Sequence, residues 1–444
     1  MIQIVHHDLT MYTGESDIER ALIDQYFKMK LQPEASNPPA VSKQQHEPKY
    51  RWVMLALVWL PYAAFGLVAN SVAPLVTPIL SDLHMSYGEM GLVLGSWQLA
   101  YIGVGVFAGS ITDRFGVRKA VLAGTIIMSI SAALRYLVTG FVPLLLTVAL
   151  FGTGAPLVSI GAPTAVSQWF SGKSRSTAVS IYTTSPSIGG LLALAGTNSL
   201  VMPLAGFSWR LTFVYFSLVT LAAAVIWWVW ARDASAAGRP KSLGVTQTLV
   251  RLVKVRNIRI IFLAGLLAFA TSHGLTNWLP TLLENQGLTP ARAGFLASVP
   301  MFAGIFAVLS IPALIPTRSR GRVAMLFAIE NAVSLILLVT TRGAPLIAAL
   351  VLFGISAYAI FPVLILMLMD SPEVGPQNMG LASGIFFAVA EIGGFGGPLL
   401  MGTFFDFSGA FFAGVVFLAA LNAAILVLAL FLKRSPERSP ISRG

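Results

Sequence analysis

The chain contains a series of apolar runs, each long enough to cross a lipid bilayer as a helix. Crossing takes about 20 apolar residues per helix. In lipid the backbone must satisfy its own hydrogen bonds, which leaves helices or closed barrels, and these runs lack the alternating pattern of a barrel. The sequence therefore predicts an all-α integral membrane protein with twelve transmembrane helices. The expected spans are 51–80, 89–112, 119–139, 143–169, 176–201, 211–231, 258–283, 291–316, 323–341, 344–369, 378–405 and 409–432.

Composition supports a membrane protein and argues against several other classes. Of the 444 residues, 56% are hydrophobic and only 11% are charged, whereas soluble domains have about 25% charged residues. The net charge is +11, but no basic face is interleaved with aromatic residues, so a nucleic-acid partner is not expected. The absence of cysteine excludes disulfides and thiolate chemistry.

The spans divide into two groups of six. We expect an N-terminal half at 51–231 and a C-terminal half at 258–432, joined by a basic cytoplasmic linker at 232–257. Residues 1–50 are polar and rich in proline, which is typical of a disordered tail, and residues 433–444 form a second tail. Met29 is an alternative start, so translation of residues 1–28 is left open.

Charge in the loops predicts the orientation. With both termini in the cytoplasm, nearly all lysines and arginines near the spans fall on that side, as the positive-inside rule requires. Arg135, Arg210, Arg292 and Arg342 remain on the opposite side. The loop 370–377 is an exception, because it has two acids and no base. We expect a multi-pass protein of the bacterial inner membrane.

The loop between spans two and three contains one acid and several bases. The stretch 109–119 resembles the G-x-x-x-D-R-x-G-R-[RK] loop of the major facilitator superfamily, although Val117 stands where that family often has Arg. The resemblance implies the superfamily fold and a gating role for Asp113, which would face the N-terminal end of span eleven, where the helix dipole is positive. The matching residues are Gly109, Asp113, Arg114, Gly116, Arg118 and Lys119.

Glycine and proline recur at corresponding positions of the two halves. Span five contains Pro186, Gly189 and Gly190, similar to a G-P-x-x-G-G element of the superfamily, and span eleven contains Gly397 and Pro398. Small residues allow close helix packing, so these five are expected to pack helices. Together with the linker, they favour two related six-helix halves, a known transporter architecture. The loop 318–322 is a second copy of the charged loop without its Asp. Pro61, Pro74 and Pro78 predict bends in span one.

No enzyme site is apparent. The sequence lacks paired-His metal spacing, a phosphate-binding G-x-x-x-x-G-K-[ST] and a nucleophile with a base. We therefore expect no catalysis, no cofactor and no metal, and an ion gradient rather than ATP as the energy source.

Ionisable residues inside spans are the main candidates for function, because they are costly in a bilayer. Glu391 lies near the middle of span eleven. It is a candidate proton carrier, and the alternative is that its side chain forms a hydrogen bond that packs helices together. His273 in span seven is a candidate for a ligand contact or a proton site. The alternative is an interior histidine whose hydrogen bonds are made within the protein. For Glu330 in span nine, we favour a structural pair with another residue over a role in ion coupling. Arg135, near the outer end of span three, either snorkels to the headgroups or binds an anion.

Neutral polar and aromatic residues of the spans complete the candidates for substrate contact, with plain packing as the alternative for each aromatic. The hydrogen-bonding candidates are Asn70, Gln98, Thr153, Ser159, Gln168 and Asn277, and the stacking candidates are Tyr62, Tyr101, Trp278 and Tyr358.

The stretch 277–294 and Arg135 resemble the cyanate and nitroimidazole porter branch of the superfamily. Val148 stands where proton-coupled drug exporters often carry Arg, which weakens a drug-export interpretation. The resemblance implies a secondary transporter using alternating access. We expect a monomer in the lipid bilayer that moves a small organic anion with protons. The alternatives are a drug or metabolite efflux antiporter and, from a different class, a non-transporting receptor on the same fold.

Overall fold

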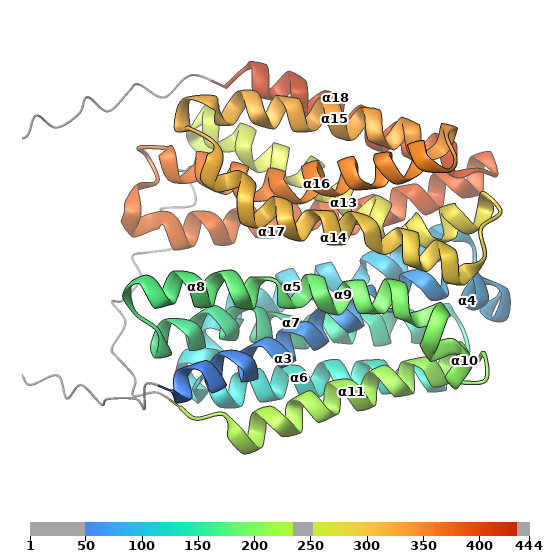
Figure 1. Ribbon diagram of the computed structural model, residues 1–444, viewed down its shortest axis with the longest axis horizontal. Helices are drawn as coiled ribbons and strands as arrows, with labels where there is room; N and C mark the ends of the chain where they lie inside the picture. Colours follow the sequence, from blue (N-terminus) through green and yellow to red (C-terminus); the bar gives the residue numbers. More distant parts are fainter. Residues whose placement is uncertain (1–48, 234–251, 433–444) are drawn as a thin grey trace, which may run out of the picture. The chain divides into compact units, whose positions relative to one another are not determined.

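The computed structural model describes residues 49–233 and 252–432, and within these residues every regular element is a helix. The described residues belong to one unit that begins at Lys49. In this part of the chain, 12 helices are long and apolar enough to cross a membrane. The predicted all-α membrane architecture is therefore confirmed (Figure 1).

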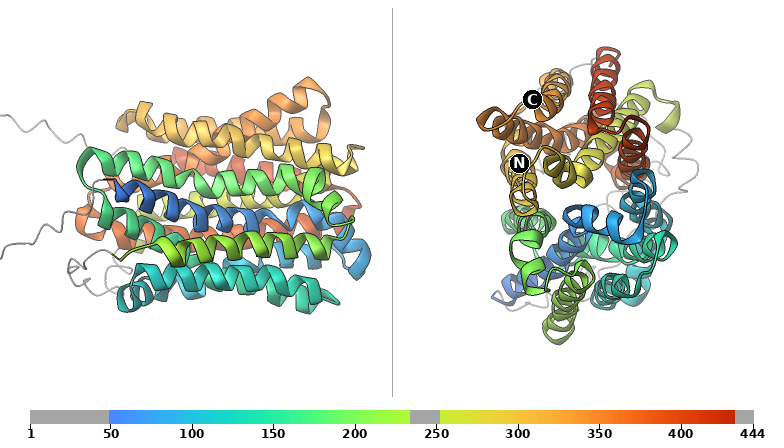
Figure 2. Two further views of the ribbon diagram at one scale, coloured as in Figure 1. Left: turned by 60° about the horizontal axis from the view of Figure 1, so that its bottom comes forward. Right: turned by 90° about the vertical axis from the view of Figure 1, so that its right-hand side faces the viewer.

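The helices form two halves of six spans, which Figure 2 shows from two sides. The first half comprises α3 (Tyr50–Asn70), η1 (Ala73–Leu75), α4 (Val76–Leu83), α5 (Tyr87–Phe115), α6 (Val117–Leu134), η2 (Arg135–Leu137), α7 (Phe141–Trp169), α8 (Gly172–Thr183), α9 (Ser185–Gly196), η3 (Thr197–Val201), α10 (Met202–Leu204) and α11 (Trp209–Trp230). The second half comprises α13 (Arg256–Asn285), α14 (Pro290–Leu314), η4 (Thr317–Ser319), α15 (Arg320–Thr340), α16 (Ala344–Asp370), α17 (Gly375–Ser408) and α18 (Phe411–Leu430).

Two spans are interrupted rather than continuous. In span one, α3 ends at Asn70 and α4 begins at Val76, with Pro74 between them. Proline lacks an amide hydrogen and its ring clashes with the preceding turn, which explains the break, although Pro61 lies inside α3 without ending it. Span five divides at Thr184, just before Pro186.

The loop after span ten is shorter than predicted. Asp370 still belongs to α16, and α17 begins at Gly375, three residues before the expected start of span eleven. Pro376 lies in the first turn of α17, where a missing amide hydrogen costs nothing. The predicted loop 370–377 therefore shrinks to residues 371–374.

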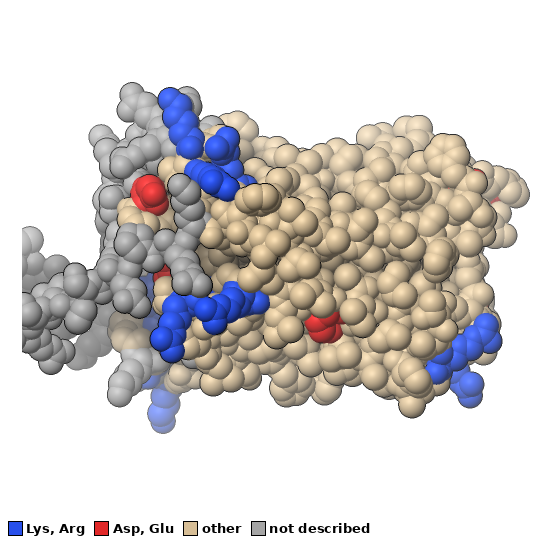
Figure 3. All heavy atoms as spheres, turned by 90° about the horizontal axis from the view of Figure 1, so that it is seen from above, with Lys and Arg blue, Asp and Glu red and all other residues tan. Residues whose placement is uncertain are grey.

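Successive spans run in opposite directions, which gives the bundle two distinct ends. The end that carries the start of α3 and the ends of α11 and α18 is here called the basic end; its arginines include Arg51, Arg114, Arg118, Arg232 and Arg256. The opposite end, with Leu83, Tyr87 and Ser408, is called the far end. On the face seen in Figure 3, lysines and arginines gather mainly at the basic end, and the belt between the ends is nearly free of charge.

The two halves meet chiefly through α5 against α17 and α9 against α14. Near the far end the first pair is in backbone contact: a Cβ atom on Gly91 would lie 2.5 Å from the Pro398 carbonyl oxygen, and one on Gly95 would lie 2.6 Å from that of Phe395. Only glycine fits at such distances. The far-end parts of the halves are therefore tightly packed.

The same two helices diverge toward the basic end. Cβ atoms on Gly103 and Gly109 of α5, or on Gly380 and Gly384 of α17, would meet no other element within 4 Å. Val106 on α5 is 73% exposed. In the described part of the chain, the halves are thus closed at the far end and open at the basic end.

The glycine and proline elements lie at helix contacts within and between the halves. A Cβ atom on Gly189 would lie 1.9 Å from the carbonyl oxygen of Ala63, and one on Gly397 would lie 2.1 Å from that of Ala270. Gly190 faces Asn70 and Met301 of α14. Gly66 and Gly91 pack directly against the backbone carbonyl oxygens of Pro186 and Pro398, respectively.

Candidate functional site

A polar contact joins the two halves in the middle of the bundle. Gln98 of α5 lies with its Nε2 atom 3.3 Å from Nδ1 of His273 on α13, and its amide donates to the ring nitrogen. Gln98 is completely buried. Gln98 was predicted only as one of several neutral hydrogen-bonding candidates, because the sequence shows no more than an amide within an apolar span.

Glu391 of α17 completes this cluster. A Cβ atom on Gly394 would lie 2.8 Å from Glu391 Oε2 and 3.4 Å from both Gln98 Cγ and His273 Cδ2, so the three side chains surround this glycine. Glu391 is only 8% exposed. Its Oε2 atom and Oε1 of Gln98 are buried without a hydrogen-bond donor. The structure therefore brings together two predicted candidates, Glu391 and His273, and leaves two acceptors unsatisfied beside them.

Aromatic rings enclose the cluster. The ring of His273 lies 6.1 Å from Trp97 and 5.5 Å from Phe269. Tyr101, one turn along α5, shares a hydrogen bond of 2.8 Å with Ser159 of α7. These rings give His273 apolar neighbours, and electrostatic interactions are stronger in apolar surroundings than in water.

Arg135 is buried inside the first half, at 1% exposure. Its Nη1 atom donates to Ser71 Oγ at 3.2 Å, its Nη2 atom to Ser131 Oγ at 3.4 Å, and its guanidinium lies 4.9 Å from the ring centre of Phe213. The Nε atom has no partner, and no ion pair of Arg135 occurs in the described part of the chain. Snorkelling to the headgroups, one of the two predicted alternatives, is therefore wrong, because neighbouring helices cover the side chain.

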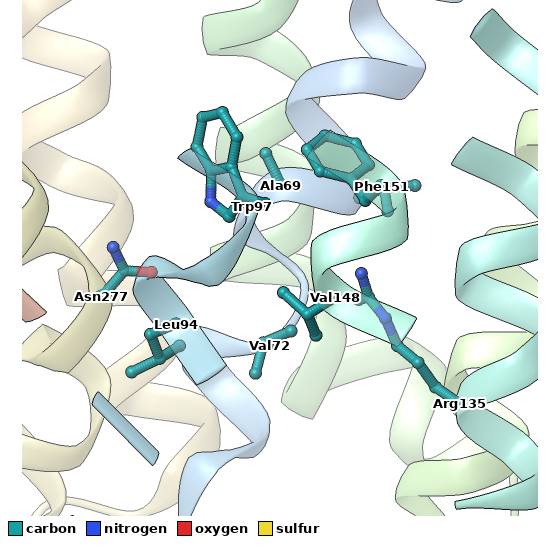
Figure 4. Close-up of a pocket in the computed structure, with 9 residues that line it drawn as sticks. Ala69, Val72, Leu94, Trp97, Arg135, Val148, Phe151 and Asn277 are labelled. Atoms are coloured by element: carbon teal, nitrogen blue, oxygen red, sulfur yellow. The ribbon is translucent and has the colours of Figure 1, made fainter. Parts of the chain in front are cut away.

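Arg135 lines a pocket that reaches the second half. Figure 4 shows Arg135, the first residue of η2 after α6, and Asn277 of α13 at this pocket. In this conformation the pocket is too narrow to hold a water molecule; its other lining residues are Val68, Ala69, Val72, Leu94, Trp97, Val148 and Phe151. Asn277 donates to the carbonyl oxygen of His273 at 2.9 Å, so the pocket adjoins the polar cluster.

The remaining acidic candidate lies away from this site. Glu330 is on α15, which packs on α16 and α18. Ser334 of the same helix donates to Glu330 Oε1 at 2.9 Å. The Oε2 atom of Glu330 is buried without a hydrogen-bond partner, so Glu330 resembles Glu391 in this respect but lies on a different helix, outside the polar cluster.

The other predicted contact residues have varied surroundings. Trp278 is completely buried and donates to the Pro398 carbonyl oxygen at 2.9 Å. Asn70 donates to the Gly66 carbonyl oxygen at 2.9 Å and faces α9. Tyr62 packs between Phe65 and Tyr182, and Tyr358 packs against Gly304. Among the predicted contacts, only Asn277 and Arg135 line the pocket.

The charged loop at 109–119 is bound to the end of α11. Arg118 donates through Nη2 to the Trp228 carbonyl oxygen at 2.6 Å, and Trp227 Nε1 donates to the Arg118 carbonyl oxygen at 2.8 Å. Gly116 turns the chain with a φ of 84°, which favours glycine. Asp113, Arg114 and Lys119 are exposed at the basic end.

In the second half, Arg320 forms an ion pair with Asp370. The degraded copy of the charged loop therefore obtains its acid from the end of α16. Of the two acids that the sequence placed in the loop 370–377, Asp370 therefore belongs to α16 and is paired with a base.

Comparisons with known proteins agree with this architecture. The chain is 26% identical over 378 residues to the hexuronate transporter of Bacillus subtilis (strain 168), covering 79% of this chain and 87% of the relative. It is 22% identical over 386 residues to multidrug resistance protein 2 of the same organism, covering 84% and 94%.

A solved structure of a bacterial homologue of the human lysosomal transporter Spinster, inward-facing and unoccupied, has the same fold, with a TM-score of 0.68 at 19% identity over 86% of this chain and 95% of that chain. The model of the Major Facilitator Superfamily matches residues 58–398. This match, the relatives and the twelve helices show a multi-pass membrane transporter rather than an enzyme, and the chain belongs to the Major Facilitator Superfamily.

Proposed function

We propose that the protein carries a small organic anion across the membrane by alternating access, coupled to protons. The observation that supports the anion is Arg135, a buried guanidinium without a carboxylate partner at a pocket between the halves. A buried charge is costly unless it is paired. A carboxylate of the substrate would supply the missing partner, and the guanidinium fork suits a carboxylate.

The relatives allow both an acid and a drug as substrate. A hexuronate carries a carboxylate, whereas the second relative is named for drug resistance. A buried arginine repels the hydrophobic cations that many drug exporters carry. Arg135 therefore favours the organic acid.

The packing of the two halves supports alternating access. They are in close contact at Gly91 and Gly95 and apart at Gly103 and Gly380, so the space between them opens at one end. A rocking motion of one half against the other would open the far end instead. The pocket beside Arg135 would widen as the helices separate.

Glu391 is the proposed proton site. Its Oε2 atom is buried without a donor, and it lies beside His273 and Gln98 at the boundary that must move. A protonated Glu391 could donate to the unsatisfied Gln98 oxygen, which would lower the cost of burying both groups. Binding a proton would thus stabilise the contact of Glu391 with Gln98 and His273 at the boundary between the halves.

The basic end is proposed to face the cytoplasm, which places both termini there. The chain contains both halves of the transporter, so we propose a monomer. The homology to a bacterial transporter supports a bacterial inner membrane.

The function can be tested with purified protein in liposomes. Uptake of radiolabelled hexuronates and other small organic acids should occur in the parent protein and be lost in Arg135→Gln. Arg342→Gln makes the same charge change at an exposed site near the far end and should keep uptake. If only hydrophobic cations raise the melting temperature or are transported, the assignment moves to drug efflux and the anion proposal is wrong.

A further inference from the structure

The N-terminus of α5 is completed by a residue of the other half. An α-helix begins with four backbone N–H groups that have no partner within the helix. Ser86 and Glu89 form a capping box, in which each side chain accepts from the backbone of the other. The N–H groups of Tyr87 and Gly88 remain, and both donate to Asp406 of α17, at 2.9 Å and 2.7 Å.

The position of Asp406 is unfavourable for its own helix. It lies in the last turn of α17, which ends at Ser408, and an acid near a helix C-terminus opposes the helix dipole. The same carboxylate is favourable at the N-terminus of α5, and hydrogen bonds to a charged group are stronger than neutral ones. The placement of Asp406 is therefore explained by α5 rather than by α17.

Neighbouring contacts also join the two halves at this end of the molecule. The Tyr87 ring stacks on Phe405 of α17, with 3.7 Å between ring centres. A Cβ atom on Gly402 would lie 2.1 Å from the Tyr87 carbonyl oxygen. Thr77 donates to Glu284, also across the two halves, at 2.5 Å.

We propose that Asp406 is a latch for the far end, which holds α17 on the N-terminus of α5 and must release when the far end opens. The arrangement mirrors the role expected for Asp113, since both acids lie near the C-terminal ends of antiparallel helices. This inference rests on the rocking motion of the proposed function but not on its substrate or on proton coupling.

The absence of cysteine from the chain permits a direct test with single-cysteine reporters. Val72→Cys reports on the far end, because Val72 is 3% exposed and lines the pocket, and Val106→Cys reports on the basic end, where that residue is 73% exposed. A polar maleimide labels each reporter in proteoliposomes. In Asp406→Asn we expect labelling at position 72 to rise about fivefold or more, as for a typical conformational coupling, and labelling at position 106 to fall.

A second variant reaches the same contact from the other helix. A Cβ atom on Gly88 would lie 2.9 Å from Asp406 Oδ2, so Gly88→Ala should displace the carboxylate while favouring the helix itself. It should change labelling in the same direction as Asp406→Asn. Asp113→Asn should shift the two reporters in the opposite direction.

The matched control is Asp82→Asn. Asp82 is also a far-end carboxylate, but it pairs with Arg210 within the first half, so its loss should leave the labelling ratio unchanged. Unchanged ratios in both Asp406→Asn and Gly88→Ala would overturn the latch, and so would a rise at both reporters, which indicates loosened packing. Because labelling needs no substrate, a failed latch and a wrong substrate assignment give different results.

Discussion

Gln98 and His273 are hydrogen-bonded across the boundary between the two halves, with 3.3 Å between Nε2 and Nδ1. Any motion that separates the halves at this depth must break the contact. Glu391 lies beside it with an unsatisfied oxygen, so a proton on Glu391 and the position of the halves should depend on each other.

Replacing Glu391 with glutamine should uncouple transport from the proton gradient. Glutamine keeps the size of the side chain but cannot gain or lose a proton. We expect uptake driven by an imposed pH gradient to be largely lost, while counterflow exchange of labelled substrate continues. Glu330→Gln makes the same change on α15, away from the cluster, and should keep gradient-driven uptake. If both variants respond to the gradient like the parent protein, Glu391 does not carry the proton.

An alanine at Gly394 should impair transport more than folding. Its Cβ atom would lie 2.8 Å from Glu391 Oε2, so the carboxylate must move away from Gln98 and His273. The change favours the helix by up to about 1 kcal/mol, which should limit any loss of stability. Gly396→Ala, two residues along the same helix, meets nothing within 4 Å and serves as the control. Equal uptake rates in these two variants would show that the cluster geometry is unimportant.

Stability should respond to the same substitution in opposite ways at two glycines of the first half. A Cβ atom on Gly66 would lie 1.9 Å from the Pro186 carbonyl oxygen, whereas one on Gly103 would meet no other element. Overpacking of this kind costs about 1–3 kcal/mol, so Gly66→Ala should lower the melting temperature in detergent. Gly103→Ala should leave it unchanged or raise it. A stable Gly66→Ala variant would contradict the close packing of α3 on α9.

The ion pair between Arg320 and Asp370 should contribute to the stability of the second half. Both side chains are largely shielded, with 14% and 28% exposure, so Asp370→Asn leaves a partly buried arginine without its acid. A loss of about 1–3 kcal/mol is expected, between the values for exposed and buried pairs. Thermal unfolding measures this, with Arg318→Gln, an exposed neighbour, as the control. The double variant Arg320→Gln/Asp370→Asn should recover part of the lost stability. If its loss instead equals the sum of the losses in the two single variants, the two residues do not stabilise each other.

Much of the architecture follows from the sequence because the requirement for a span is local. A run of apolar residues satisfies its own backbone hydrogen bonds in lipid wherever it packs, so the spans and the two halves could be predicted. The interruption of span one was predicted only as a bend near Pro74, because the loss of a single amide donor does not specify whether a helix kinks or ends. The start of α17 was missed by three residues for a similar reason.

The candidate site could be predicted in part from the sequence, and the rest of it follows only from the tertiary structure. The sequence by itself determined that Glu391, His273 and Arg135 are costly groups within apolar spans, and hence candidates for function. Only the tertiary structure decided that Glu391 and His273 meet around Gly394 together with Gln98, that Arg135 is buried toward a pocket instead of snorkelling, and that Asp406 caps a helix of the other half. Each of these depends on which faces of distant helices pack together, and packing is set by side-chain shape across elements hundreds of residues apart rather than by any local pattern.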